Sequence, residues 1–106
     1  MEIRLKDRVV ATGVVKEIEE HITSRGGSFP DWYVGIAADP EARLFVDHGV
    51  RRKGDHWIYR EAGTSQVARF VEEFFIDLRG TDGGTGGGDA SSTSVYAYRK
   101  RPHTRE

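Results

Sequence analysis

The hydrophobic pattern between Ser65 and Gly80 constrains the fold more than any other feature of the sequence. Apolar residues recur there at steps of three and four, which is the pattern of an amphipathic helix: Val67, Phe70, Val71, Phe74, Phe75 and Leu78. Thr64 and Ser65 supply a helix start, and Gly80 supplies a C-terminal stop. Because the chain has 106 residues, 37% of them hydrophobic, we expect a single domain over residues 1–106 with one modest core.

Two further segments have helix patterns. The first covers about residues 7–24 and ends before Gly26 and Gly27, with apolar residues at four-residue steps: Val10, Val14, Ile18 and Ile22. The second begins at Asp39-Pro40-Glu41, which combines an N-cap acceptor, a preset first helical residue and an acidic first turn. We predict that this helix runs to about Asp47 and stops at Gly49.

Three short runs rich in aromatic and β-branched residues predict strands. They cover residues 32–37, 57–61 and 95–100, and the middle run is expected to be partly exposed because Arg60 and Glu61 interrupt it. The glycine-rich residues 80–94 are expected to form a flexible loop. The sequence therefore predicts an α+β fold, in which about three helices pack a small, mainly antiparallel three-stranded sheet.

The composition excludes several classes of site. The sequence contains no cysteine, so disulfides, thiolate zinc sites and cysteine nucleophiles are all ruled out. No apolar run approaches the roughly 20 residues that a membrane span requires, and the first residues lack a signal-peptide pattern. We therefore expect a soluble, cytoplasmic protein that does not bind a membrane.

Charge gives a weaker indication of a binding partner. The net charge is −1, so the whole molecule does not attract a polyanion at long range. Basic residues nevertheless cluster locally, and either a phosphate-binding face or a solvated surface accounts for them: Arg51, Arg52, Lys53, Lys100 and Arg101, with Arg99 and Arg105 beside them.

The segment that begins at Tyr33 resembles the second motif of the GIY-YIG nuclease family. In that family a tyrosine-hydrophobic-glycine strand leads into a helix whose arginine lies ten residues after the tyrosine, as Arg43 does here. A later helix of the family has an alanine four residues before a glutamate, which Ala68 and Glu72 match. The resemblance covers about residues 32–79 and implies a GIY-YIG-like fold.

The resemblance implies a metal-dependent endonuclease that hydrolyses DNA phosphodiester bonds. Glu72 would hold one Mg²⁺ or Mn²⁺ ion, Arg43 would neutralise charge on the scissile phosphate, and Tyr33 would orient or deprotonate water. These residue types suit the chemistry, because phosphodiester hydrolysis needs a polarised water and charge compensation on the phosphoryl oxygens. The planar guanidinium of arginine can also bond two phosphate oxygens at once.

The family's first motif, a glycine-isoleucine-tyrosine strand, does not precede Tyr33, where the sequence predicts a helix instead. We predict a permuted arrangement in which strand 95–100 takes the place of the first strand and supplies the missing tyrosine as Tyr96 or Tyr98. The family often has a histidine four residues after the arginine, whereas His48 follows Arg43 by five. His48 is therefore either a base or proton shuttle or a solvated histidine that complements a helix dipole. The family's late asparagine has no counterpart, because the sequence contains none.

Each candidate residue also has a purely structural interpretation. Tyr33 suits a core strand, Arg43 could pair with Asp47 one turn later, and Glu72 could be a glutamate at the border of its helix. Two other functions stay open, namely nucleic-acid binding without cleavage and recruitment of a partner chain by an exposed aromatic strand edge. A DNA-cutting domain of near-neutral charge would gain affinity from a separate DNA-binding protein. The sequence leaves the oligomeric state open.

Overall fold

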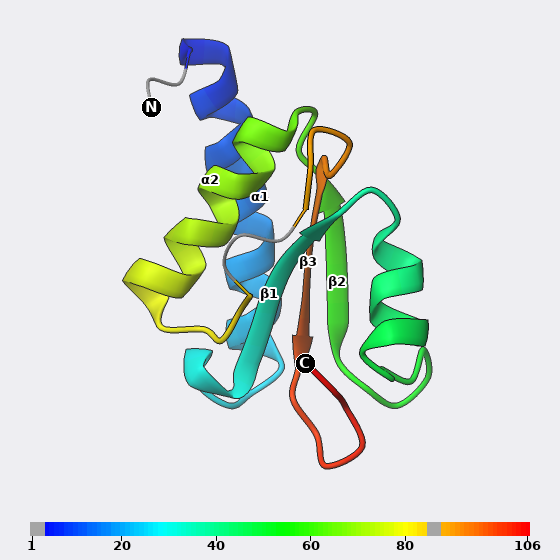
Figure 1. Cartoon of the computed structure of the whole chain (residues 1–106). Helices are drawn as coiled ribbons and strands as arrows, with labels where there is room; N and C mark the ends of the chain where they lie inside the picture. The colour runs from blue at the N-terminus through cyan, green and yellow to red at the C-terminus, as the bar shows by residue number, and fades with distance from the viewer. Residues whose placement is uncertain (1–3, 85–87) are drawn as a thin grey trace.

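The computed structural model describes residues 4–84 and 88–106, and their arrangement is an α+β fold (Figure 1). A three-stranded sheet has the order β1-β3-β2, and both pairings are antiparallel. The fold class predicted from the sequence is thus confirmed. The elements are α1 (Leu5–Ser24), η1 (Phe29–Asp31), β1 (Trp32–Ala37), η2 (Ala42–Asp47), β2 (Trp57–Glu61), α2 (Ser65–Phe74), η3 (Phe75–Arg79) and β3 (Ser94–Arg99).

The last strand of the chain is the central strand of the sheet. In the register with β1, Tyr33 lies opposite Tyr98 and Gly35 lies opposite Tyr96, while in the register with β2, Tyr96 lies opposite Tyr59. Since β3 is paired on both sides, its tyrosines cannot form an exposed sheet edge. The edge strands are β1 and β2, and part of β1 is covered by Asp82, which exchanges backbone hydrogen bonds with Trp32 and Val34.

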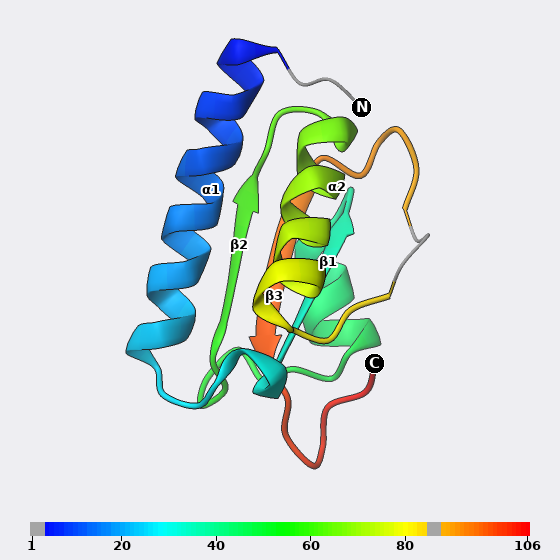
Figure 2. The same ribbon diagram turned by 90° about the vertical axis from the view of Figure 1, so that its left-hand side faces the viewer.

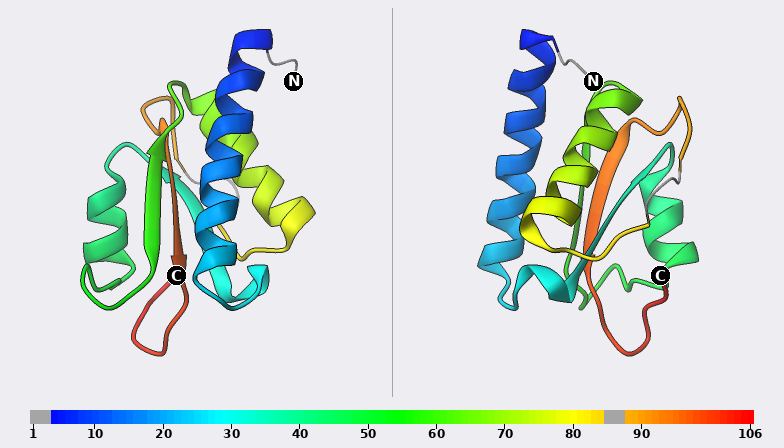
Figure 3. Two further views of the ribbon diagram at one scale, coloured as in Figure 1. Left: turned by 180° about the vertical axis from the view of Figure 1, so that it is seen from behind. Right: turned by 60° about the vertical axis from the view of Figure 1, so that its left-hand side comes forward.

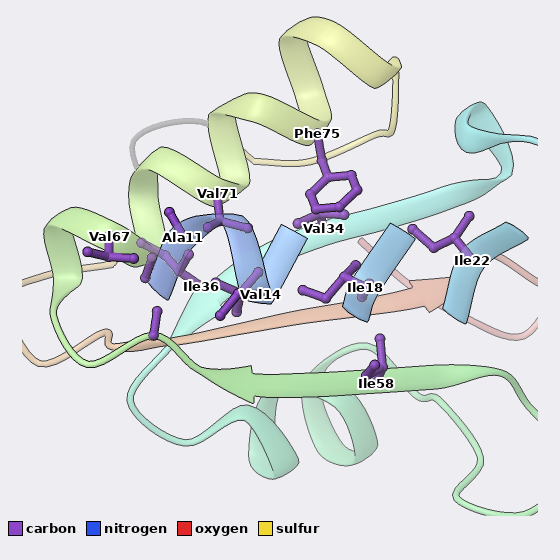
Figure 4. Close-up of a cluster of buried hydrophobic side chains, with 14 of the residues drawn as sticks. Ala11, Val14, Ile18, Ile22, Val34, Ile36, Ile58, Val67, Val71 and Phe75 are labelled. Carbon is purple, nitrogen blue, oxygen red and sulfur yellow. The ribbon is translucent and has the colours of Figure 1, made fainter. Parts of the chain in front are cut away.

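Helices α1 and α2 cover one face of the sheet (Figure 2). Because side chains alternate along a strand, this face receives every second residue, and aliphatic groups from the helices interlock with them (Figure 4). The buried set includes Ile18 and Ile22 from α1, Val34 and Ile36 from β1, Val67 and Val71 from α2, and Phe75 from η3.

Three residues expected in the helix stripes are exposed instead. Val10 is 42% exposed because four-residue steps drift around a helix with 3.6 residues per turn, and Ala11 takes the buried place. Phe70 is 46% exposed because the buried face of α2 is rotated toward the small Ala68. Leu78 is 68% exposed in η3, a π-helical turn that changes the phase of the side chains.

The short helix η2 covers the other face of the sheet (Figure 3). Asp39 accepts a hydrogen bond from the backbone of Ala42, as its predicted role at the helix start requires. Residues 42–47 form a π-helical turn, and Gly49 follows with a φ of 70°. Tyrosines fill this face together with a few aliphatic residues, and the buried set is Tyr33, Ala37, Leu44, Val50, Tyr96 and Tyr98.

The glycine-rich segment begins at Gly80, whose φ of 82° ends the helical region as predicted. Residues 80–84 and 88–94 are described, and they hold the Asp82 bridge to β1 and a turn from Asp89 to Ser92. The predicted flexibility also concerns residues 85–87, which lie outside the described part of the chain. Among the described helices, none combines the length and apolar character of a membrane-spanning segment.

Candidate functional site

A pocket of about 430 Å³ lies beside the edge strand β1. Segments far apart in the sequence form its walls: β1 and the turn after it, η2, one residue of α2, one residue of β3, and the glycine-rich loop. Four of the five predicted catalytic residues line it, namely Tyr33, Arg43, Glu72 and Tyr96. The fold therefore brings together the residues that the resemblance selects.

The two tyrosines of the pocket meet because β1 contains a glycine. A Cβ atom on Gly35 would lie 2.5 Å from the Tyr96 hydroxyl and 2.6 Å from its ring carbon Cζ, so a side chain at this position would displace Tyr96. The rings of Tyr33 and Tyr96 are stacked, with their centroids 6.2 Å apart and an angle of 26° between their planes. Burial raises the pKa of Tyr33, while the Arg43 charge lowers it and the Glu72 carboxylate adds to the increase.

His48 is 2% exposed and lies behind Tyr96. Its Nε2 atom is 2.7 Å from the Tyr96 hydroxyl, and its Nδ1 atom is 2.6 Å from the backbone oxygen of Arg105. A carbonyl oxygen can only accept, so Nδ1 carries the hydrogen and Nε2 accepts the proton of Tyr96. The interpretation of His48 as a solvated helix-end residue is therefore wrong, since the C-terminal residues bury it.

The protonation of this cluster follows from its burial. Burial lowers the pKa of His48, so the imidazole is neutral near pH 7. Burial also raises the pKa of Tyr96 well above its usual value, while the neighbouring Arg43 works in the opposite direction. Tyr96 therefore keeps its proton near pH 7 and donates it to the neutral imidazole.

Arg43 links the surface to the pocket. Its Nη1 atom lies 3.1 Å from Oδ2 of Asp47, as the helical spacing predicts, and its Nη2 atom lies 3.5 Å from the Tyr96 hydroxyl. The contact with Tyr96 contributes most to a raised pKa of Arg43. The predicted pair with Asp47 is therefore present, and another edge of the guanidinium faces the pocket.

Glu72 is 2% exposed and lines the pocket from the helical side of the sheet. Its interpretation as a border residue is therefore wrong. Burial raises the pKa of Glu72 to about 7, an increase that the positive charge of Arg69 opposes. No group within residues 4–84 and 88–106 forms a hydrogen bond with its carboxylate, which leaves the oxygens available to a ligand in the pocket.

Glu72 is the residue of the described pocket lining that could hold a divalent cation. Glu72 and Asp39 are the carboxylates among the described lining residues, and Asp39 is engaged by the Ala42 backbone. The described part of the chain has no group of three His, Asp or Glu side chains that could hold a metal by itself. Mg²⁺ commonly binds through one or two carboxylates and completes its shell with water and phosphate oxygens, and Glu72 suits that kind of site.

The five predicted nucleic-acid-binding residues lie outside the described lining of the pocket. Arg52 pairs with Glu41 and lies 4.1 Å from the Phe45 ring centre, and Lys100 pairs with Asp82. Arg51, Lys53 and Arg101 are exposed. A hydrogen bond between His103 and Asp55 brings the segment of Arg101 beside the segment of Arg51 and Lys53.

Two features of the site were missed by sequence reasoning. The Gly35 contact could have been found, because this glycine belongs to the motif that contains Tyr33. The backbone of Arg105, which holds His48, gives no signal in the sequence, since a carbonyl group is present at every position. No family model, no curated protein and no solved structure matches the chain.

Proposed function

We propose that this protein is a metal-dependent nuclease that hydrolyses DNA phosphodiester bonds in the pocket beside β1. The observation that carries the proposal is the convergence of Tyr33, Arg43, Glu72 and Tyr96 on one pocket. These residues come from four different elements, and their types suit the charge compensation and proton transfer that phosphodiester hydrolysis needs. A pocket formed for packing alone would have no need of an arginine and a buried carboxyl group that forms no hydrogen bond within residues 4–84 and 88–106.

Tyr96 and His48 form the proton path. As water attacks phosphorus, a new P–O bond forms, and the water proton passes to the Tyr96 oxygen while the Tyr96 proton passes to Nε2 of His48. The 2.7 Å contact between these two atoms is short enough for this transfer. The P–O bond to the leaving oxygen then breaks, and that oxygen takes up a proton from solvent. Tyr33, which lines the pocket together with Tyr96, helps to orient the water.

Arg43, and a cation held by Glu72, would compensate the negative charge of the substrate phosphate. Arg43 remains charged at any working pH, and its edge toward Tyr96 faces the position of a phosphate in the pocket. Glu72 would hold the Mg²⁺ or Mn²⁺ ion. When bound, that ion supplies further charge compensation on the phosphoryl oxygens. Because burial raises the pKa of Glu72 to about 7, the carboxyl group must lose its proton before it binds a cation, and activity should rise as the pH passes neutrality.

The position of β3 supports the permuted arrangement as part of this proposal. β3 lies between the two other strands and presents Tyr96 to the same pocket as Glu72. Tyr98 is on the same face but contacts Nδ1 of His48 at 3.1 Å, so Tyr96 is the better candidate for the missing tyrosine. The chain would thus keep the site of a GIY-YIG nuclease while its strands follow a different order in the sequence.

The test is cleavage of labelled duplex, single-stranded and branched DNA in the presence of Mg²⁺ or Mn²⁺. We expect the wild type to cut at least one substrate, and we expect Glu72→Gln to lower the rate by at least about a hundredfold. Glu73→Gln is the matched control, because it removes the same charge from the exposed neighbouring residue and should keep the wild-type rate.

Three results would contradict the proposal. Cleavage that is equal in wild type and Glu72→Gln would exclude the role of Glu72. Binding of DNA without cleavage by either protein would favour a nucleic-acid-binding domain that does not cut. If the protein neither binds nor cuts DNA, recruitment of a partner chain through the β2 edge becomes the better explanation.

A further inference from the structure

The residues after β3, which we call the tail (residues 100–106), fold back onto His48, the residue that accepts the Tyr96 proton. The backbone N–H of Arg105 donates to the backbone oxygen of His48 at 2.7 Å, and the backbone oxygen of Arg105 lies 2.6 Å from Nδ1 of the same histidine. One residue of the tail therefore contacts both the main chain and the side chain of His48. The Tyr98 hydroxyl lies 3.1 Å from Nδ1 of His48 and 3.3 Å from the Arg105 oxygen, so it contacts both members of this pair.

Contacts before Arg105 hold the tail in this position. The His103 ring is hydrogen-bonded to the Asp55 carboxylate at 2.6 Å. Closer to the sheet, the backbone N–H of Lys100 donates to the backbone oxygen of Asp31. The tail is thus attached to the loop before β2 and to the end of η1. Together with the hydrogen bond from the Arg105 N–H to the His48 oxygen, these attachments fix the place of the Arg105 carbonyl.

The Arg105 carbonyl determines which nitrogen of His48 carries the hydrogen. A carbonyl has no hydrogen to donate, so it is compatible only with a protonated Nδ1. In a neutral imidazole this leaves Nε2 unprotonated and able to accept the proton of Tyr96. The Tyr98 hydroxyl cannot impose this choice by itself, because a hydroxyl can either donate to Nδ1 or accept from it.

We propose that the tail is a positioning element, and that the backbone of Arg105 locks His48 in the tautomer that accepts the Tyr96 proton. Its importance for catalysis rests on the nuclease function proposed above, whereas the state of the imidazole can be measured without any substrate. Arg105 acts through His48 and does not touch the reacting atoms. Its backbone contributes the effect, so the identity of its side chain should matter little to the tautomer.

The first experiment is ¹⁵N NMR of the histidine rings at neutral pH, with the His48 signals assigned by comparison with His48→Gln. In the full chain we expect a protonated Nδ1 and an unprotonated Nε2 on His48. In a chain shortened after Thr104, which lacks the Arg105 backbone, we expect both tautomers to be populated. Arg105→Ala is the matched control, because it keeps the backbone groups and should keep the ring state of the full chain.

Two NMR results would overturn the proposal: a hydrogen on Nε2 in the full chain, or an unchanged ring state in the folded shortened chain. If the shortened chain does not fold, Tyr98→Phe provides a second test, since it leaves the Arg105 carbonyl in place. This variant should keep the hydrogen on Nδ1, and movement of the hydrogen to Nε2 would show that Tyr98, not Arg105, sets the tautomer.

Cleavage by the shortened chain separates this inference from the nuclease proposal. If the full chain cuts DNA, we expect the shortened chain to lose about tenfold in kcat with little change in KM, since proton transfer is impaired while phosphate binding is not. Unchanged kcat in a shortened chain with mixed tautomers would refute the role in catalysis. If the tautomers behave as expected but no chain cuts DNA, the nuclease proposal fails and the positioning of His48 by the tail stands.

Discussion

The two faces of the sheet are built from alternate residues of the same strands, yet they differ in chemistry. The helical face is formed by aliphatic and aromatic side chains such as Val34, Ile36 and Val95, which pack against α1 and α2. The opposite face carries Tyr96 and Tyr98, whose hydroxyls take part in hydrogen bonds with His48. Adjacent residues of one strand therefore serve packing on one side and polar chemistry on the other.

This difference predicts which amino-acid substitutions should leave the site intact. Apolar burial stabilises roughly in proportion to area and has no directional requirement, so the helical face is expected to tolerate changes that preserve volume. Buried hydroxyls and an imidazole need partners in defined positions, and a group left without one costs about 1–3 kcal/mol. We therefore expect substitutions on the helical face to change stability and substitutions on the tyrosine face to change activity.

The largest change in the free energy of unfolding is expected for a substitution on the helical face. Phe75 is fully buried there, so Phe75→Ala should lower the free energy of unfolding by about 3–5 kcal/mol through lost burial and a residual cavity. Phe70→Ala is the control, because the same substitution at a side chain that is 46% exposed should cost less than about 1 kcal/mol. Urea unfolding measures both, and equal losses in the two variants would disprove the packing assignment of Phe70 in α2 and Phe75 in η3.

The second prediction concerns Glu72, which is buried and lines the pocket from the helical side of the sheet. Burial raises the pKa of Glu72 to about 7 from 4.5, so the folded protein retains a proton that the unfolded chain releases. The free energy of unfolding should therefore fall as the pH rises from about 4.5 to about 7, by about 3 kcal/mol from this group, and then level off. Glu72→Gln should remove this component, which the difference between the two unfolding curves isolates.

Repeating the unfolding measurement with Mg²⁺ or Mn²⁺ tests whether Glu72 binds the cation. If Glu72 holds Mg²⁺ or Mn²⁺, either ion should stabilise the ionised carboxylate in the folded state and shift the fall in stability toward lower pH, or offset it. The same ion should leave the pH dependence of Glu72→Gln unchanged. An identical shift in the two proteins would place the cation at another site.

The third prediction tests the close approach of β1 to Tyr96. Gly35→Ala adds a Cβ atom 2.5 Å from the Tyr96 hydroxyl, so the ring must move away from β1. We expect a loss of about 1–3 kcal/mol in stability and a loss of cleavage that exceeds what the remaining folded fraction explains. Gly13→Ala is the control, because nothing lies within 4 Å of its added Cβ and alanine favours a helix interior. Full activity in Gly35→Ala would show that the position of Tyr96 is unimportant.

Sequence reasoning predicted the elements of this fold well because their signals are local. The periodicity of α1 placed Val14, Ile18 and Ile22 in the core, and the helix begins at Leu5, two residues before the predicted start at about residue 7. The glycines after the helices also stop them as expected. The exposure of Phe70 was not predictable, because the face that a helix buries depends on the sheet against which it packs.

The candidate site was predictable only where residue type and spacing carry information. Tyr33, Arg43 and Glu72 could be selected in this way, and Tyr96 followed from the need for a second tyrosine. The burial of His48 could not be predicted, because it results from a contact with a backbone carbonyl 57 residues farther along the chain. Interactions of this kind depend on the path of the main chain and leave no pattern in the side chains.

The smallest expected effect concerns the ion pair at the rim of the tyrosine face. The Arg43 and Asp47 side chains are 44% and 50% exposed, so solvent screens their attraction, and Asp47→Asn should change the free energy of unfolding by less than about 0.5 kcal/mol. The substitution keeps the size of the side chain and leaves the Arg43 contact with Tyr96 in place. DNA cleavage should therefore persist, with affinity equal or slightly higher, because one negative charge is removed from the pocket rim. A stability loss above 1 kcal/mol in urea unfolding would show that this pair holds η2 in place, so that the tyrosine face owes its order to a surface charge pair.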